Sequence, residues 1–154
     1  MSEKTELSEK RETIINGEGL VAGRLASIIA KRLLMGEIIV VVNAEKIIIT
    51  GTRKRVLQWY GKRVLEWRTY HNPEKRGPKI PRRPDLVFKR MVRGMLPKKK
   101  PRGREALKRL IVYIGIPDEL RGKKAEVPEA AKLKNKQIPY VTLAEIYESF
   151  GGRL

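Results

Sequence analysis

The chain has no cysteine and only one histidine, His71, among its 154 residues. Disulfides, thiolate metal sites and thiol catalysis are therefore excluded. A single histidine could complete a zinc site only with several carboxylates, which its surroundings do not offer. As a general base it would need an orienting partner, and none is evident. With no paired carboxylates and no serine nucleophile motif, the sequence predicts no enzyme activity, no metal and no cofactor.

Long apolar runs are missing too. No stretch approaches the ~20 apolar residues that a membrane-spanning helix needs. The first dozen residues are polar and mixed in charge, unlike a secretory signal. We therefore expect a soluble intracellular protein with a flexible tail over residues 1–12. Hydrophobic residues still make up 41% of the chain, which is enough for a domain with its own core.

Acidic residues are scarce in the middle of the chain. Residues 52–110, here called the basic segment, hold 21 basic and four acidic residues, whereas residues 1–51 hold seven of each. The net charge of +18 comes almost entirely from this segment. A block of one sign attracts polyanions. A membrane surface would call for a basic amphipathic helix, and the prolines and glycines here indicate loops instead. Nucleic acid is the expected partner.

The N-terminal part predicts a parallel sheet. Residues 13–16 form a strand candidate, and residues 24–36 carry apolar side chains at helical spacing, with Gly36 where the helix should end. Residues 38–42 are an unbroken β-branched run, typical of a strand buried on both faces. Residues 47–49 form a second short strand after a turn. Strand, helix and strand together favour a βαβ unit.

The first half of the basic segment contains an eight-residue repeat, KRVLQW followed by KRVLEW, over residues 54–67. Thr50 or Thr52 can cap a helix here, and Gly61 weakens it, so the part beyond can run extended. Aromatic residues among cations suggest base stacking. On a helical stripe, however, Trp59 and Trp67 are predicted to belong to the core, as is Tyr60.

The second half of the basic segment starts with an exposed loop rich in proline, glycine and arginine, residues 71–84. Pro84 suits the first position of a helix. One apolar stripe of that helix is predicted, made of Phe88, Met91, Val92 and Met95. Near the C-terminus, Thr142 and Glu145 form a capping box, which predicts a short helix docked on the domain or on a neighbour.

Between these elements lies the sequence MLPKKKPRGR, residues 95–104. Pro97 and Pro101 restrict the backbone, so the three lysines between them are predicted to project from a loop of nearly fixed shape, which lowers the ordering cost of binding. Gly103 is expected to let a phosphate approach the main chain. A short helix from Arg104 is expected to offer free N–H groups to an anion.

The glycines at 17, 19 and 23 link a strand to a helix, as a dinucleotide-binding fingerprint does. The spacing is one residue too long, and Asn43 stands where the ribose carboxylate belongs. A tight turn before a helix is the favoured interpretation.

Four segments carry a family resemblance: GRLASIIAKRLL, VVNAEKIIITG, RRPDLVFKRMVRGMLP and GREALKRLIVYIGIP. In this order, from about Thr13 to Pro117, they resemble the signature blocks of ribosomal large-subunit protein thirteen in its archaeal–eukaryotic branch. The resemblance implies a three-layer α/β/α domain around a small, mostly parallel sheet, with no enzyme activity. It also implies binding to large-subunit ribosomal RNA. The bacterial branch has a different loop at residues 71–84, so contacts known there do not transfer.

The expected organisation is a tail over residues 1–12, an RNA-binding domain over 13–117 and a C-terminal extension over 118–154. The expected partners are large-subunit ribosomal RNA and neighbouring ribosomal proteins in the cytoplasm, without membrane, small-molecule substrate or cofactor. An RNA-modifying enzyme and a nucleoid DNA-binding protein remain the alternatives. The candidate RNA-binding residues are Arg53, Lys54, Arg55, Lys62, Arg63, Arg68, Tyr70, His71, Lys75, Arg76, Lys79, Arg82, Arg83, Lys89, Arg90, Arg93, Lys98, Lys99, Lys100, Arg102, Gly103 and Arg104.

Overall fold

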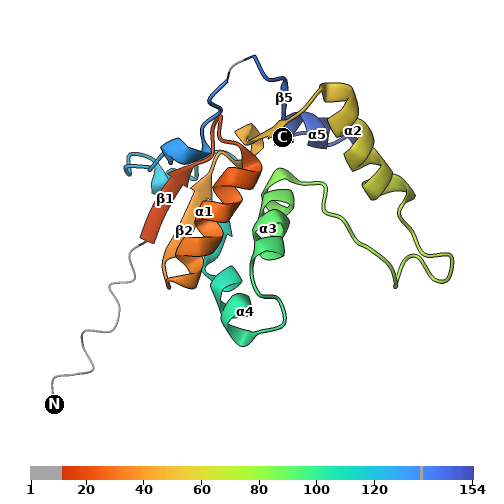
Figure 1. The fold of residues 1–154 in the computed structure, drawn as a ribbon, viewed down its shortest axis with the longest axis horizontal. Helices are drawn as coiled ribbons and strands as arrows, with labels where there is room; N and C mark the ends of the chain where they lie inside the picture. The colour runs from red at the N-terminus through yellow and green to blue at the C-terminus, as the bar shows by residue number, and fades with distance from the viewer. Residues whose placement is uncertain (1–11, 136) are drawn as a thin grey trace.

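A three-stranded parallel sheet lies at the centre of the computed structural model, which describes residues 12–135 and 137–154 (Figure 1). Its strands stand in the order β1 (Glu12–Asn16), β2 (Ile38–Val42) and β4 (Leu110–Val112). Helix α1 (Ala22–Leu34) connects β1 to β2, and the two strands pair in parallel. The predicted βαβ unit and the α/β class with a small parallel sheet are therefore confirmed.

The central strand β2 is buried, as its β-branched run predicts. Residues 39–42 are all buried, because side chains on alternate faces of the strand are both covered. On one face, Val41 belongs to the same core cluster as Leu25 and Phe88. On the other face, Leu120 and Ala125 line a small cavity together with residues of the sheet.

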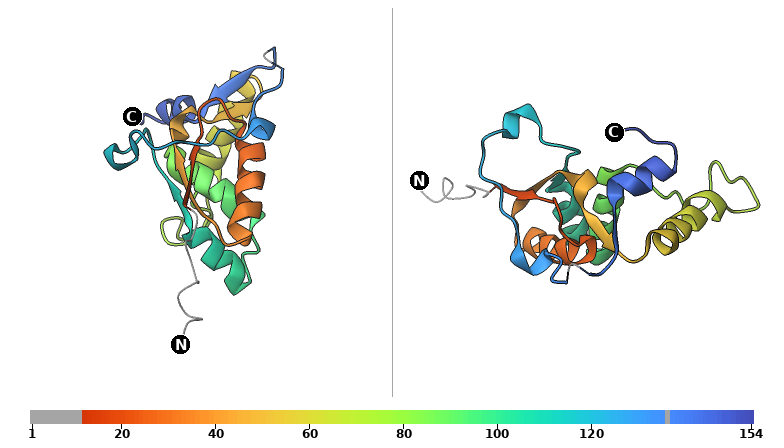
Figure 2. Two further views of the ribbon diagram at one scale, coloured as in Figure 1. Left: turned by 90° about the vertical axis from the view of Figure 1, so that its left-hand side faces the viewer. Right: turned by 90° about the horizontal axis from the view of Figure 1, so that it is seen from above.

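The two faces of the sheet are covered in different ways (Figure 2). Helices α3 (Pro84–Met95) and α4 (Pro101–Lys108) pack against α1 and β4. The chain after β4, with the short 3-10 helix η3 (Asp118–Leu120), crosses the opposite side. That outer layer is irregular chain rather than α-helix. It also adds a bridge to the sheet edge, where the Glu126 amide donates to the Ile14 carbonyl at 2.8 Å.

A second, two-stranded sheet joins the C-terminal segment to the body. It pairs β3 (Ile48–Thr50) with β5 (Tyr140–Thr142) in antiparallel fashion. The capping box is confirmed, since the Thr142 hydroxyl accepts from the Glu145 amide at 3.2 Å at the start of α5 (Leu143–Ser149). Leu143 and Ile146 are buried in the same core cluster as α1. The short C-terminal helix is thus docked on the domain itself.

An arm projects from the body between β3 and α3 (Figure 1). It consists of α2 (Arg53–Gly61), the π-helix η2 (Lys62–Glu66) and irregular chain up to Arg83. Val56 and Tyr60 anchor its root in the core, and this burial raises the pKa of Tyr60 to about 12. The expectation of extended chain after Gly61 is wrong, because the helix continues with wider π turns.

Two predicted features of the following helices need correction. Met95 is 46% exposed, and Leu96, just beyond the end of α3, fills the core position instead. Phe88, Val92 and Leu96 are four residues apart, so the spacing of the stripe did not distinguish Met95 from Leu96. Helix α4 begins at Pro101 rather than Arg104, because proline suits a first helical turn.

Candidate nucleic-acid interface

The cations of the basic segment are hardly neutralised within the protein. In the part of the chain that the structure describes, two of them form ion pairs: Arg53 with Glu145 at 3.6 Å and Arg83 with Asp85 at 3.0 Å. Arg32 in the body behaves differently. Burial alone would lower its pKa, but hydrogen bonds to two carboxylates raise it. The uncompensated charge is therefore concentrated in the basic segment.

The candidate residues fall into three regions along the chain. Nearly all of them are exposed; Arg63 and Lys89 are half-buried and Gly103 is buried. The arm carries Arg53, Lys54, Arg55, Lys62, Arg63, Arg68, Tyr70, His71, Lys75, Arg76, Lys79, Arg82 and Arg83. Helix α3 carries Lys89, Arg90 and Arg93. The turn after α3 and the start of α4 carry Lys98, Lys99, Lys100, Arg102, Gly103 and Arg104.

At the outer end of the arm the side chains are presented by a hydrogen-bonded turn. The amides of Lys75 and Arg76 donate to the Asn72 carbonyl at 3.2 and 2.9 Å. Tyr70 and His71 stand next to this turn; Tyr70 is fully open to solvent and His71 is exposed. Both are therefore placed where an RNA base could stack on them.

A groove of about 270 Å³ brings the three cations of α3 together. Lys89, Arg90 and Arg93 line it, and Leu86 and Leu107 are among its apolar walls. Leu107 comes from α4 and the cations from α3. The groove therefore runs from one helix to the other. Arg90 also donates to the Lys79 carbonyl, which ties the returning arm to α3.

The lysine turn over residues 97–100 is exposed at all three lysines. Its shape is held by the Lys100 amide, which donates to the Pro97 carbonyl at 3.2 Å. Gly103 has a different role from the predicted one. A Cβ atom there would lie 2.2 Å from the Pro97 carbonyl oxygen, so glycine lets α4 pack against the turn. The expected set of free helix amides is also reduced, because Gly103 and Arg104 both donate to the Lys100 carbonyl.

Arg102 has a structural contact that the sequence did not reveal. It donates to the Leu34 carbonyl at 3.1 Å, and Arg109 donates to the Leu33 carbonyl at 2.8 Å. Both carbonyls belong to the last turn of α1, where cations stabilise the negative end of the helix dipole. Arg102 therefore joins α4 to α1, whatever else it binds.

The two tryptophans were predicted to be core residues, and this is wrong for both. Trp59 and Trp67 are 48% and 45% exposed, whereas Tyr60 is buried as predicted. The Arg63 guanidinium lies 3.5 Å from the Trp59 ring centroid and 4.8 Å from that of Trp67. The eight-residue repeat was the signal in the sequence, because it places both indoles on one side of the arm.

The three lysines of the turn allow a direct test of RNA contact. Changing Lys98, Lys99 and Lys100 together to Glu should lower RNA affinity by at least about tenfold, because nearby phosphates would then be repelled. The melting temperature should stay near that of the parent, since surface substitutions shift stability by less than about 0.5 kcal/mol each. Binding titrations and thermal melts measure the two effects.

A matched control is the Lys123→Glu, Lys124→Glu, Lys134→Glu protein, which changes three exposed lysines outside the basic segment. Its RNA affinity should fall much less than that of the lysine-turn variant. Equal losses in the two proteins would show that overall charge matters and the turn does not.

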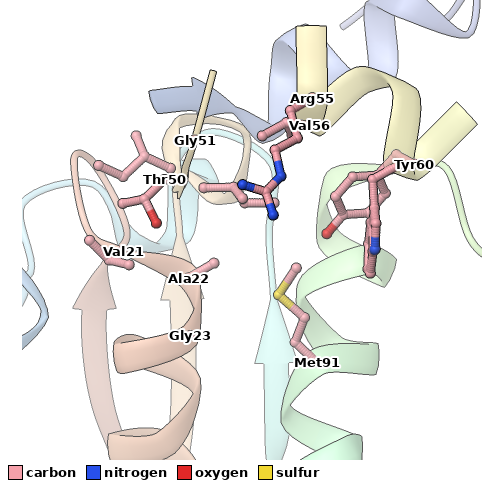
Figure 3. A pocket seen from close by; sticks show the side chains of 12 residues that line it. Val21, Ala22, Gly23, Thr50, Gly51, Arg55, Val56, Tyr60 and Met91 are labelled. Carbon is pink, nitrogen blue, oxygen red and sulfur yellow. The ribbon is translucent and has the colours of Figure 1, made fainter. Parts of the chain in front are cut away.

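The largest cavity described, about 560 Å³, lies between the start of α1, strand β3 and helix α2 (Figure 3). The Arg55 guanidinium points into it, above Met91. Its walls are otherwise mainly apolar, with Thr50 and Tyr60 as hydroxyl groups, and none of the lining residues is a carboxylate. The cavity thus offers no acid–base pair of the kind that an RNA-modifying enzyme would use.

The glycine-rich turn beside this cavity has a packing explanation. A Cβ atom on Gly17 would lie 2.7 Å from the Ile47 side chain. Asn43 is buried at the end of β2, and its side-chain amide donates to the Asn16 side-chain oxygen at 3.0 Å.

Among residues 12–135 and 137–154, no cluster of three or more metal-ligating side chains occurs. Across the same residues, every helix is too short or too polar to span a bilayer.

A small α/β body with a basic arm, a cationic helix groove and a lysine turn is typical of proteins that bind structured nucleic acid. Residues 10–119 match the family described as Ribosomal protein L13, and the chain belongs to that family.

The similar proteins include the large ribosomal subunit protein uL13 of Pyrobaculum neutrophilum, 64% identical over 147 residues, which are 92% of this chain and 81% of the relative. The protein of the same name from Archaeoglobus fulgidus is 48% identical over 143 residues, covering 92% of this chain and 88% of the relative. That of Methanocaldococcus jannaschii is 45% identical over 141 residues, covering 92% and 98%.

Proposed function

We propose that the protein is a structural constituent of the large ribosomal subunit, where it binds folded large-subunit ribosomal RNA through the basic segment. The observation that carries this proposal is the unbalanced charge: 21 cations in residues 52–110, of which two are paired within the described protein. Unpaired surface cations are the groups that replace counterions on phosphates. The role is structural and involves no catalysis.

The arrangement of the basic segment favours contact with RNA at more than one place. The arm ends where α3 begins, and the lysine turn begins just beyond the end of α3. A helix of 12 residues separates these regions by about 18 Å, and the groove with Lys89, Arg90 and Arg93 lies between them. One protein of this shape can hold two RNA segments in a fixed relation, which would support assembly of the subunit and hence translation.

The family relationship supports the same proposal. The curated relatives are named as large ribosomal subunit proteins, and the family match covers the whole basic segment. We propose that neighbouring large-subunit proteins are the other partners, in the cytoplasm. Tyr113 and Ile116, which are exposed beyond β4, provide apolar surface for such contacts.

Sedimentation of a cell lysate tests the proposal against an RNA-modifying enzyme. A ribosomal constituent should travel with the large subunit in a one-to-one amount and stay there in washes that remove loosely bound proteins. A modifying enzyme should appear in substoichiometric amounts and largely in the soluble pool. A soluble pool as the main location would contradict the proposed function.

A further inference from the structure

The arm carries two large aromatic side chains that the fold does not bury. Trp59 and Trp67 are the only tryptophans in the chain, and about half of each is open to solvent. Isolated exposed apolar residues are common on protein surfaces. Two exposed indoles held against a common arginine are less easily explained by chance, because tryptophan exposed in this way is typical of binding sites.

Arg63 organises the two indoles into a stack. Its guanidinium lies 3.5 Å from the Trp59 ring centroid and 4.8 Å from the Trp67 centroid. A planar guanidinium stacks on aromatic faces, which lysine cannot do. Trp59 is held from behind by the buried Tyr60, whose ring meets it edge-on at 4.8 Å and 71°. The stack is therefore attached to the core and already in place before a ligand arrives.

The π-helix explains why the two indoles lie on the same side. In an α-helix, eight residues turn the chain about 80° beyond two full turns. The Trp67 amide instead donates to the Lys62 carbonyl, five residues earlier, at 3.2 Å. Such a turn winds more slowly and reduces the offset between Trp59 and Trp67. Single π turns in helices are frequently found at functional sites.

The stack borders a cavity large enough for one planar ring. Trp59, Arg63 and Trp67 form one side of a space of about 220 Å³, and Pro78 and Pro81 on the returning chain are among the residues that close it. Arg90 of α3 also lines this space. A space lined by two indoles and two arginines suits an uncharged flat ring that is attached to a phosphate.

We propose that Trp59, Arg63 and Trp67 form a stacking site for an unpaired nucleobase of RNA. The proposal deepens the proposed function and rests on it: phosphates would be held by the cations of the arm, and the stack would select nucleotides whose base faces are free. Lys62 and Arg68 flank the stack in sequence and complement a phosphate chain. Bases in a duplex are stacked on each other, so the site would favour loops, bulges and single strands.

The chain supplies its own probe. Because both tryptophans belong to the stack, the tryptophan fluorescence of the full-length protein, excited where tyrosine hardly absorbs, reports on this site alone. The protein is titrated with a non-self-complementary RNA strand of about ten nucleotides and, separately, with the duplex of that strand and its complement. We expect the single strand to quench the emission and the duplex to leave it nearly unchanged. Electrostatics alone predicts the opposite order, because the duplex has the higher charge density.

Substitutions separate stacking from charge. Trp67→Ala should weaken binding of the single strand roughly five- to a hundredfold, while the slope of log affinity against log salt stays the same because no charge is lost. Leu65→Ala is the matched control, since Leu65 is a similarly exposed residue of the same π turn that does not line the cavity. Its affinity should remain close to that of the parent.

A charge-conserving pair gives a second comparison. Arg63→Lys keeps the cation but removes the planar guanidinium that lies over both indole rings. It should therefore weaken single-strand binding and change the fluorescence of the free protein. Arg153→Lys changes an exposed arginine outside the basic segment and should do neither. Thermal melts of all four variants should match the parent. Trp67, Leu65 and Arg153 are exposed, and Arg63→Lys keeps a cation at a half-buried position.

The outcomes distinguish failure of the stacking site from failure of the proposed function. Steep, salt-dependent RNA binding that is indifferent to Trp67→Ala would overturn the stacking site and leave the proposed function standing. Unchanged RNA binding with weaker attachment to a ribosomal protein would show that the stack is a protein contact, which also overturns it. Failure of the parent protein to bind RNA at low salt would contradict both.

Discussion

The affinity of the isolated protein for a large-subunit RNA fragment should fall by about a thousandfold or more when salt rises from 50 to 200 mM. This follows if roughly six to ten phosphates are neutralised, because each releases a condensed counterion whose return becomes easier as salt increases. The structure makes such a number reasonable, since exposed cations stand in the arm, along α3 and in the lysine turn. Titrations at several salt concentrations give the slope directly.

A control for this experiment is the triple Lys→Glu protein of the lysine turn, whose slope should be shallower because fewer cations meet phosphates. A nearly flat response of the parent would mean that hydrogen bonds and stacking dominate and that the charge of the basic segment is not the main source of affinity.

Changing Val92 to Asp should unfold the protein or remove most of its stability. Val92 is fully buried in α3, in the same cluster as Phe88 and Leu96. A carboxylate there would lose its water without gaining a partner, which costs about 4 kcal/mol or more. Domains of this size are stable by only about 5–15 kcal/mol. Circular dichroism during thermal or urea unfolding measures the loss.

Met95→Asp is the matched control, three residues further along the same helix but 46% exposed. Its stability should change by less than about 1 kcal/mol, with a small loss because an acid stands at the negative end of the helix dipole. Equal destabilisation by the two changes would mean that Met95 is buried at the end of α3.

The elements that the sequence predicted correctly are those with a local physical cause. The β-branched run of β2, the proline that opens α3 and the capping box of α5 each depend on a few neighbouring residues. Strand β5 has only three residues, too few for a periodic pattern, and forms because β3 offers it a free edge. The end of α3 was misjudged because Met95 and Leu96 fit the helical spacing almost equally well.

The candidate site shows the same division. Charge is a property of the sequence, so the basic segment could be delimited without a structure. The roles of particular residues could not be predicted in this way, because they depend on contacts between distant elements. Arg102 holds the end of α1, Gly103 fits against Pro97, and Trp67 lies near Arg63 after a π turn that Gly61 does not predict.

The arm has a further consequence for how such a chain can change over time. None of the residues from Gly61 to Lys79 is buried, and the strands of both sheets lie outside this stretch. Mutations and length changes there therefore have little effect on folding, and selection acts on them through what the arm contacts. Substitutions in the body are limited first by packing in the core. Within one polypeptide, the outer arm is free to change with whatever partner it contacts, while the sheet stays as it is.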